Sequence, residues 1–127
     1  MKTILVDAAD ALFVDAKVFE AMKTMLDTFA NRKLVLTNAN DEQIESFGIN
    51  KSPYEVFSLK HNPDKTDSIY YQKMLSHYNL TSDEVIYFEH AEAAVKSAES
   101  VGIKSYHYDS GKQDLESLKK FLMENLK

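Results

Sequence analysis

The sequence has no cysteine, only three glycines and two prolines, and no long apolar run. Without cysteine the chain can form neither disulfides nor thiolate sites, so its fold does not depend on the redox state of its compartment. No apolar run approaches membrane-spanning length, and strand-like sequence that begins at Thr3 leaves no room for a signal peptide. We therefore expect a soluble, cytoplasmic protein.

The chain also lacks any basic cluster. It carries 20 acidic and 15 basic residues, a net charge of −5, and its basic runs are short pairs such as Lys119-Lys120. Proteins that bind nucleic acids or anionic membranes present concentrated positive charge. Nucleic acid and membrane are therefore excluded from the expected partners.

Short apolar runs alternate with helical periodicity along the whole chain. The predicted strands are Thr3–Val6, Lys33–Leu36, Glu55–Leu59, Glu84–Phe88 and Lys104–Tyr108. Apolar residues at helical spacing lie between and after them, in 18–29, 71–78, 91–101 and 115–126. Alternating strands and helices favour a parallel sheet covered on both faces. We predict one α/β domain over residues 1–127, a Rossmann-like three-layer αβα sandwich with a mainly parallel five-stranded sheet.

Polar residues follow the predicted strands or precede the next helix. They are Asp7, Thr37 with Asn38, Lys65, and Glu89 with His90. The carboxyl ends of parallel strands share one crevice, so these residues are expected to converge there. A carboxylate, a hydroxyl and an ammonium suit phosphate chemistry, as nucleophile or metal ligand and as ligands of phosphoryl oxygens. The irregular segment 48–65, which holds both prolines, is the expected loop over this site.

Four segments resemble the motifs of the haloacid dehalogenase-like (HAD) superfamily. TILVDAADALF is similar to a strand followed by DxDGT, and KLVLTNAN to a strand that ends in Thr or Ser. KTDSIYYQKML is similar to KPDPxIYxxAL, and VIYFEHAEAAVKSAESVG to a strand that ends in an acidic pair or Gly-Asp. The order and spacing of all four hold over roughly residues 3–108.

The resemblance implies a role for each matched residue. Asp7 would be the nucleophile that forms an aspartyl-phosphate, and Thr37 and Lys65 would hold the transferring phosphoryl group, with Asn38 beside them. Mg²⁺ would be held by Asp7, Glu89 and His90 together with the backbone carbonyl of Ala9. Imidazole suits transition metals better than Mg²⁺, so His90 biases such a site toward a transition metal.

The sequence departs from the family pattern at several positions. Ala9 replaces the second aspartate, which is the general acid and base of the family, and Asp10-Ala11 replaces Gly-Thr. Loss of a general acid typically costs about 10²–10⁴-fold in rate, and the cost is least for acyl and aryl phosphates. Glu89-His90 replaces the acidic pair of the fourth motif.

The site residues also have simpler interpretations. Asp7 and Thr37 fit turn residues that cap the ends of strands, and Lys65 fits a solvated surface lysine. His90 fits a loop or partner-contact residue better than a metal ligand, and Asp10 fits a solvated loop acid. These interpretations stay open at the level of the sequence.

Two functions follow from the resemblance. The first is a weak or specialised phosphohydrolase for phosphoesters or acyl phosphates, and the alternative is a catalytically degraded relative that binds a phospho-ligand or a protein partner. The short segments between motifs resemble a member without a cap domain, which leaves the site open to a phosphorylated small molecule or a phosphoprotein. A homo-oligomer is compatible with this, since a second subunit would then supply the lid. A response-regulator receiver is excluded, because Asp109 follows the fifth strand where receivers need lysine.

Overall fold

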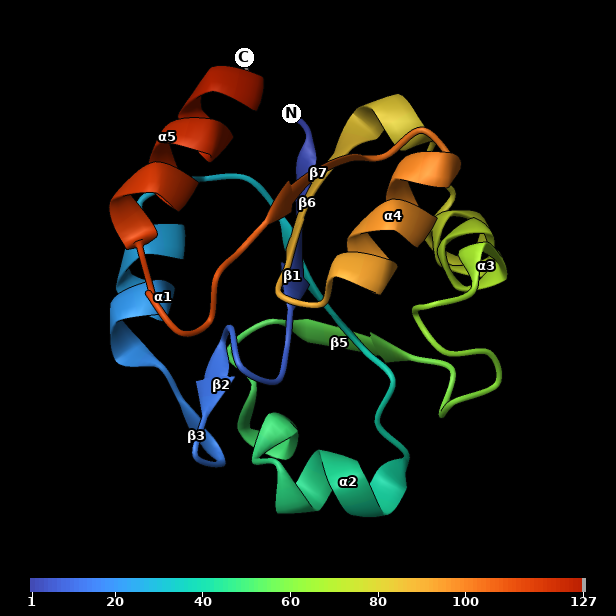
Figure 1. The fold of residues 1–127 in the computed structure, drawn as a ribbon, viewed down its shortest axis with the longest axis horizontal. Helices are drawn as coiled ribbons and strands as arrows, with labels where there is room; N and C mark the ends of the chain where they lie inside the picture. The colour runs from blue at the N-terminus through green and yellow to red at the C-terminus, as the bar shows by residue number, and fades with distance from the viewer. Residues whose placement is uncertain (127) are drawn as a thin grey trace.

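A computed structural model describes residues 1–126 as a parallel sheet between two helical layers (Figure 1). The five strands are β1 (Thr3–Asp7), β4 (Lys33–Thr37), β5 (Glu55–Ser58), β6 (Val85–Glu89) and β7 (Lys104–His107). Their order in the sheet is β5-β4-β1-β6-β7, and every neighbouring pair is parallel. The predicted α/β, Rossmann-like fold is confirmed.

The helices divide between the two faces of this sheet. They are α1 (Glu20–Leu26), α2 (Asp41–Ser46), α3 (Ser68–Tyr78), α4 (Glu92–Ser100) and α5 (Leu115–Asn125). Helices α1 and α5 lie on one face and α3 and α4 on the other, while α2 lies beyond the carboxyl ends of the strands (Figure 1). Among the described residues, every helix is too short or too polar to span a bilayer.

Alternation along the two central strands decides which side chains meet each helical layer. In β1, Ile4 and Val6 pack in the core under α1 and α5, whereas Leu5 packs in the core under α3 and α4. In β6, Phe88 packs in the core under α1 and α5, and Tyr87 packs in the core under α3 and α4. Because successive side chains point to opposite faces, the next residue of each strand, Asp7 or Glu89, returns to the side of α3 and α4.

Three of the strands extend one residue further than predicted. Strand β1 includes Asp7, β4 includes Thr37, and β6 runs from Val85 through Glu89 rather than from Glu84 to Phe88. A polar residue after an apolar run is typical of a strand end, because an unpaired buried charge is costly. Here the polar side chains stay within the sheet because they find buried partners. The other two strands stop one residue early, at Ser58 and His107.

The structure also contains a hairpin that was not predicted from the sequence, just ahead of the helix expected over 18–29. Strands β2 (Phe13–Val14) and β3 (Lys17–Val18) pair in antiparallel fashion ahead of α1. Their turn uses Asp15 and Ala16, both with φ in the left-handed region, instead of the glycine that normally signals such a turn. A strand of two residues is too short to show an alternation of apolar and polar side chains in the sequence. Val18 therefore fits the helical spacing as well as it fits a strand.

Two short inserts therefore lie at the carboxyl edge of the sheet. One is the β2–β3 hairpin, and the other contains α2 and the 3₁₀ helix η1 (Ile49–Lys51). They meet at Gly48, whose φ is 76° and where an added Cβ would lie 2.2 Å from the carbonyl oxygen of Ala16. A second 3₁₀ helix, η2 (Ser82–Glu84), precedes β6 on the opposite side of the molecule from the inserts.

Candidate functional site

Two carboxylates lie side by side at the carboxyl edge of the central strands. Asp7 ends β1 and Glu89 ends the neighbouring β6, and their relative exposures are only 1% and 0%. Strand alternation turns both side chains toward the layer of α3 and α4. Two carboxylates buried this closely need positive charge between them.

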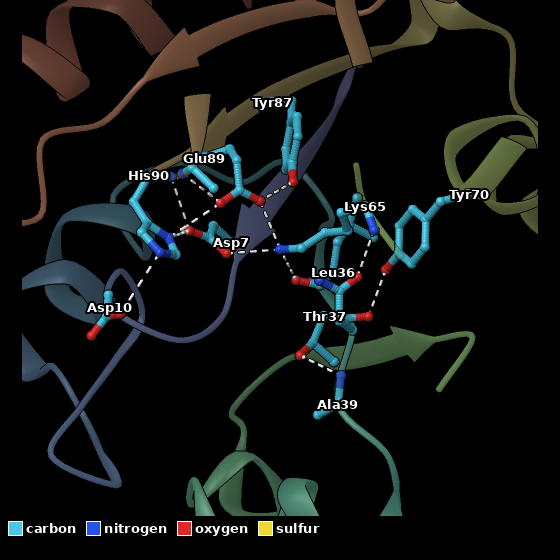
Figure 2. A network of polar contacts seen from close by, with 12 residues as sticks. Asp7, Asp10, Leu36, Thr37, Ala39, Lys65, Tyr70, Tyr87, Glu89 and His90 are labelled. Carbon is cyan, nitrogen blue, oxygen red and sulfur yellow. Dashed lines mark hydrogen bonds and ion pairs between the residues drawn. The ribbon is translucent and has the colours of Figure 1, made fainter. Parts of the chain in front are cut away.

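Lys65 supplies the first of these positive charges. It lies in the loop between β5 and α3, and its Nζ is 2.9 Å from Asp7 Oδ1 and 2.7 Å from Glu89 Oε1. Its third bond goes to the carbonyl oxygen of Leu36, at 3.1 Å. The ammonium therefore uses its three N–H groups within the protein (Figure 2). The solvated interpretation of Lys65 is wrong, since this residue is 6% exposed.

His90 supplies the second positive charge. Its Nδ1 hydrogen-bonds to Asp7 Oδ2 and lies 3.2 Å from Glu89 Oε2, and its backbone N–H donates to Asp7 Oδ2 at 3.0 Å. Its Nε2 points outward and lies 3.7 Å from Oδ2 of the exposed Asp10. His90 lies in the loop between β6 and α4, and its ring turns back onto the end of β1.

Burial and charge shift the ionisation of this four-residue cluster. Hydrogen bonds to Asp7 and then to Glu89 raise the pKa of His90 to about 10. Burial raises the pKa of Asp7, and the Lys65 charge only partly opposes this. Burial also acts to raise the pKa of Glu89, but the Lys65 charge and the His90 hydrogen bond outweigh it and hold that pKa far below its usual range. We infer that two anions and two cations balance in the cluster.

A buried tyrosine pair holds Glu89 in place from behind. The hydroxyl of Tyr87 donates to Glu89 Oε1, and the hydroxyl of Tyr71 from α3 lies 3.2 Å from that of Tyr87. The backbone N–H of Ala91 donates to Glu89 Oε2 at 3.0 Å. Each oxygen of Glu89 therefore has two partners, which accounts for its complete burial.

Within residues 1–126, Thr37 and Asn38 at the end of β4 have side-chain donors with no hydrogen-bond acceptor. The Thr37 hydroxyl oxygen accepts the N–H of Ala39 at 3.2 Å, so its proton remains available to donate. The Asn38 side-chain oxygen accepts the backbone N–H of Lys65 at 2.6 Å, which leaves its amide N–H groups to donate. These donors are the kind that bind phosphoryl oxygens.

One cavity of about 290 Å³ joins these groups. All the residues predicted for the site line it, including Ala9. Sequence reasoning missed Gln43, Phe47 and His61, which line it as well. The signal for His61 was its place in the segment 48–65, which was expected to lie over the site. Ala39, Thr66 and the start of α4 complete the walls.

Asp7, Glu89 and His90 could hold a metal ion, since one ligand atom from each lies within 4.8 Å of the others. Two carboxylates and an imidazole form a suitable donor set for a divalent ion. The same imidazole nitrogen is bonded to Asp7, so an ion bound there must displace the proton of His90. We therefore expect metal binding to release a proton and to weaken as pH falls.

The raised pKa of His90 gives a prediction for stability in the presence of a chelator. The folded-state pKa is about 10, against an ordinary value of 6.5, so the stabilising charge is fully present below pH 6.5 and is lost as pH rises toward 10. Melting temperatures measured between pH 6 and 10 should fall more steeply for the wild type than for His90→Gln. Parallel curves for the two proteins would show that His90 carries no such charge.

The fold of this chain is similar to that of solved HAD-superfamily hydrolases. A HAD-superfamily hydrolase of subfamily IA from Geobacter sulfurreducens matches over 85% of this chain and 89% of its own, with a TM-score of 0.65 and 14% identity. A HAD family enzyme from Bacteroides thetaiotaomicron, an aspartate-to-alanine mutant in complex with magnesium and inorganic phosphate, matches over 87% and 95%, with a TM-score of 0.68 and 11% identity. A HAD-superfamily hydrolase from Ehrlichia chaffeensis matches over 87% and 60%, with a TM-score of 0.66 and 16% identity.

No protein-family description matches the sequence, and no curated protein matches it significantly. The structural likeness alone shows that this chain has a HAD-like fold. At identities of 11–16%, this structural likeness shows the fold alone, and the chemistry must be argued from the residues of the site.

Proposed function

We propose that this chain is a phosphohydrolase that cleaves phosphoesters or acyl phosphates through Asp7. The observation that carries the proposal is the convergence on one cavity of a carboxylate held by two cations and of free hydroxyl and amide donors. A carboxylate nucleophile needs to be held in place, and the phosphoryl group needs donors around its oxygens. Asp7 supplies the first, and Thr37 and Asn38 supply the second.

The reaction has two steps at Asp7. In the first, a carboxylate oxygen of Asp7 bonds to phosphorus and the bond from phosphorus to the leaving group breaks. Within residues 1–126, Oδ1 has one partner, Lys65, so this oxygen keeps a lone pair for the attack, whereas Oδ2 has two bonds to His90. In the second step, water attacks phosphorus, inorganic phosphate leaves and the carboxylate is regenerated.

Lys65 acts in this scheme mainly through its charge. Its three N–H groups already go to Asp7, Glu89 and the carbonyl of Leu36. A direct bond to a phosphoryl oxygen would therefore replace one of these three partners. We propose that Lys65 orients Asp7 and offsets the negative charge that the phosphoryl group brings.

A metal ion would be held by Asp7, Glu89 and His90, with the carbonyl of Ala9 as a further ligand. An ion there would polarise a phosphoryl oxygen. The structure of the Bacteroides thetaiotaomicron enzyme contains both magnesium and inorganic phosphate, which supports the proposal that a metal ion and a phosphoryl group bind together in this fold. The imidazole in the donor set favours manganese or zinc over magnesium.

The second candidate is a binding protein for a phospho-ligand or a phosphoprotein. The observation that favours it is the alanine at position 9, which offers no acid to the leaving group. The balanced cluster of Asp7, Lys65, Glu89 and His90 would persist in such a protein as a structural element. This candidate predicts phosphate affinity without turnover.

Hydrolysis of acetyl phosphate and p-nitrophenyl phosphate tests the proposal. The protein is assayed with Mg²⁺, Mn²⁺, Zn²⁺ and EDTA in turn, and inorganic phosphate binding is measured by calorimetry in parallel. We expect turnover of both substrates, fastest with a transition metal at or above pH 8. Phosphate binding without turnover under every condition would reject the hydrolase in favour of the binding protein.

A further inference from the structure

The proposed reaction lacks a proton donor for the leaving group at the place where the resemblance puts one. Ala9 ends in a methyl group, and the neighbouring Asp10 has a side chain that is 68% exposed and lines a separate hollow under the hairpin. An ester leaving group departs slowly as an alkoxide, so any activity on alkyl phosphates requires an acid from elsewhere.

Among the described residues, one titratable side chain of the cavity wall does not belong to the four-residue cluster of Asp7, Lys65, Glu89 and His90. The titratable residues that line the cavity are Asp7, His61, Lys65, Glu89 and His90. Four of them bond to one another, so their protons are engaged at the nucleophile. His61 comes from the loop between β5 and α3 and has partners of its own.

Two acceptors hold the ring of His61. Its Nδ1 lies 2.8 Å from Oδ1 of Asp64, and its Nε2 lies 2.6 Å from Oε1 of Gln43. Gln43 Oε1 also accepts the backbone N–H of Asn40 at 3.0 Å, as part of the capping box of α2. That bond fixes the amide oxygen toward His61, so the ring nitrogen Nε2 donates a hydrogen bond to it. The ring is therefore held as a proton donor toward an oxygen at the cavity wall.

The backbone at this point adopts a costly conformation. Lys60 and His61 have φ values of 54° and 65°, in the left-handed region that non-glycine residues seldom adopt. The loop is anchored by Ser58, whose Oγ accepts the N–H of Lys60 at 3.0 Å, and by the N–H of Asn62, which donates to the carbonyl of Leu59 at 3.0 Å. Consecutive residues held in this way are frequent at functional sites.

We propose that His61 is the general acid and base of this site, and the proposal rests on the phosphohydrolase function proposed above. As the oxygen of Asp7 bonds to phosphorus, the bond to the ester oxygen breaks, and the Nε2 proton of His61 moves to that oxygen, which leaves as an alcohol. The neutral ring then takes a proton from the water that attacks the aspartyl-phosphate. Phosphate leaves, and Asp7 and the protonated ring are restored.

Asp64 and Gln43 have distinct parts in this scheme. Asp64 is a positioning residue, because its carboxylate holds Nδ1 and leaves Nε2 directed at Gln43, another residue of the cavity wall. Gln43 Oε1 marks the direction in which Nε2 donates, and the leaving-group oxygen replaces it as the acceptor when the substrate is bound. Gln43 and His61 line the same cavity as Asp7, so the proposed proton donor and the nucleophile border one space.

The dependence of rate on the leaving group tests this assignment. Wild type, His61→Gln and Asp64→Asn are compared on acetyl phosphate, p-nitrophenyl phosphate and glycerol 2-phosphate, whose leaving groups become steadily poorer. His61→Gln should lower kcat/KM for glycerol 2-phosphate by about 10²-fold or more and leave acetyl phosphate within about threefold. Asp64→Asn should show the same pattern with a smaller loss. The matched control is His77→Gln, since His77 is an exposed histidine in the last turn of α3, and this variant should change kcat/KM for none of the three substrates.

Each other outcome overturns the assignment. If His61→Gln lowers kcat/KM equally for all three substrates and leaves the melting temperature unchanged, His61 acts in substrate binding and not as the acid. A wild type that hydrolyses acetyl phosphate but not glycerol 2-phosphate would show that the site has no general acid. A wild type inactive on all three substrates would reject the phosphohydrolase itself, and this failure is distinct from the other two.

Discussion

Replacing Lys65 with methionine is expected to lower the free energy of unfolding by about 3–5 kcal/mol, the range found when one partner of a buried ion pair is removed. Methionine fills a similar volume but leaves Asp7 and Glu89 beside each other, with His90 as the one remaining cation of the cluster. Urea denaturation at pH 7 measures the loss.

The pH dependence of that loss has a definite sign. Lys65 lowers the pKa of Glu89 below its ordinary value of 4.5, so this contribution to stability is present above pH 4.5 and is lost as pH falls below it. The difference between wild type and Lys65→Met should therefore narrow in acid.

Lys60→Met is the matched control for Lys65→Met. Lys60 pairs with Asp41 at 3.0 Å, but the two side chains are 57% and 83% exposed. Exposed pairs of this kind contribute about 0–1 kcal/mol. If Lys65→Met costs no more than Lys60→Met, the two carboxylates do not depend on Lys65 and the charge balance inferred for the cluster is wrong.

Replacing Asp7 with asparagine is expected to reduce turnover of acetyl phosphate and p-nitrophenyl phosphate by about 10⁴-fold or more, since a missing nucleophile removes the covalent path. Asparagine keeps the size of the side chain, and its amide oxygen can still accept a hydrogen bond from Lys65. Its amide oxygen is a far weaker nucleophile than a carboxylate. Steady-state kinetics measures the loss, and circular dichroism shows whether the variant remains folded.

Asp10→Asn is the control for Asp7→Asn. Asp10 lies three residues away, its side chain is 68% exposed, and its polar contact with the cluster is at 3.7 Å. Its turnover should stay within about threefold of the wild type, because exposed groups at this distance contribute little. Retained activity in Asp7→Asn would place the nucleophile elsewhere, whereas retained phosphate affinity without turnover in both wild type and Asp7→Asn would favour the binding protein.

The order of the elements and the edge that carries the site were predictable from local pattern. Apolar runs that alternate with segments of helical spacing predict a parallel sheet. The carboxyl ends of its strands lie along one edge, where the chain leaves each strand for the next helix. This pattern alone places Asp7, Thr37, Lys65 and Glu89 at one edge. The cavity that they line agrees with that placement.

The contacts within the site were not predictable, because they depend on the twist of neighbouring strands and on the paths of loops. Nothing local indicates that the ring of His90 turns back onto Asp7, or that Lys65 crosses from its loop to the centre of the sheet. In the sequence, His61 cannot be told from an ordinary exposed loop histidine, because its contact with Gln43 depends on the position of α2. The hairpin at Asp15 was missed because its turn contains no glycine.

Trapping the covalent intermediate would show whether Asp7 is the nucleophile. Wild type and Asp7→Asn are incubated with acetyl phosphate, quenched in acid and digested, and the peptides are sequenced by tandem mass spectrometry. We expect one phosphoryl group on the side chain of Asp7 in the wild type and none at this position in the variant. Steady turnover of acetyl phosphate with no phosphoryl group on Asp7, or with the group on another residue, would contradict the proposed reaction.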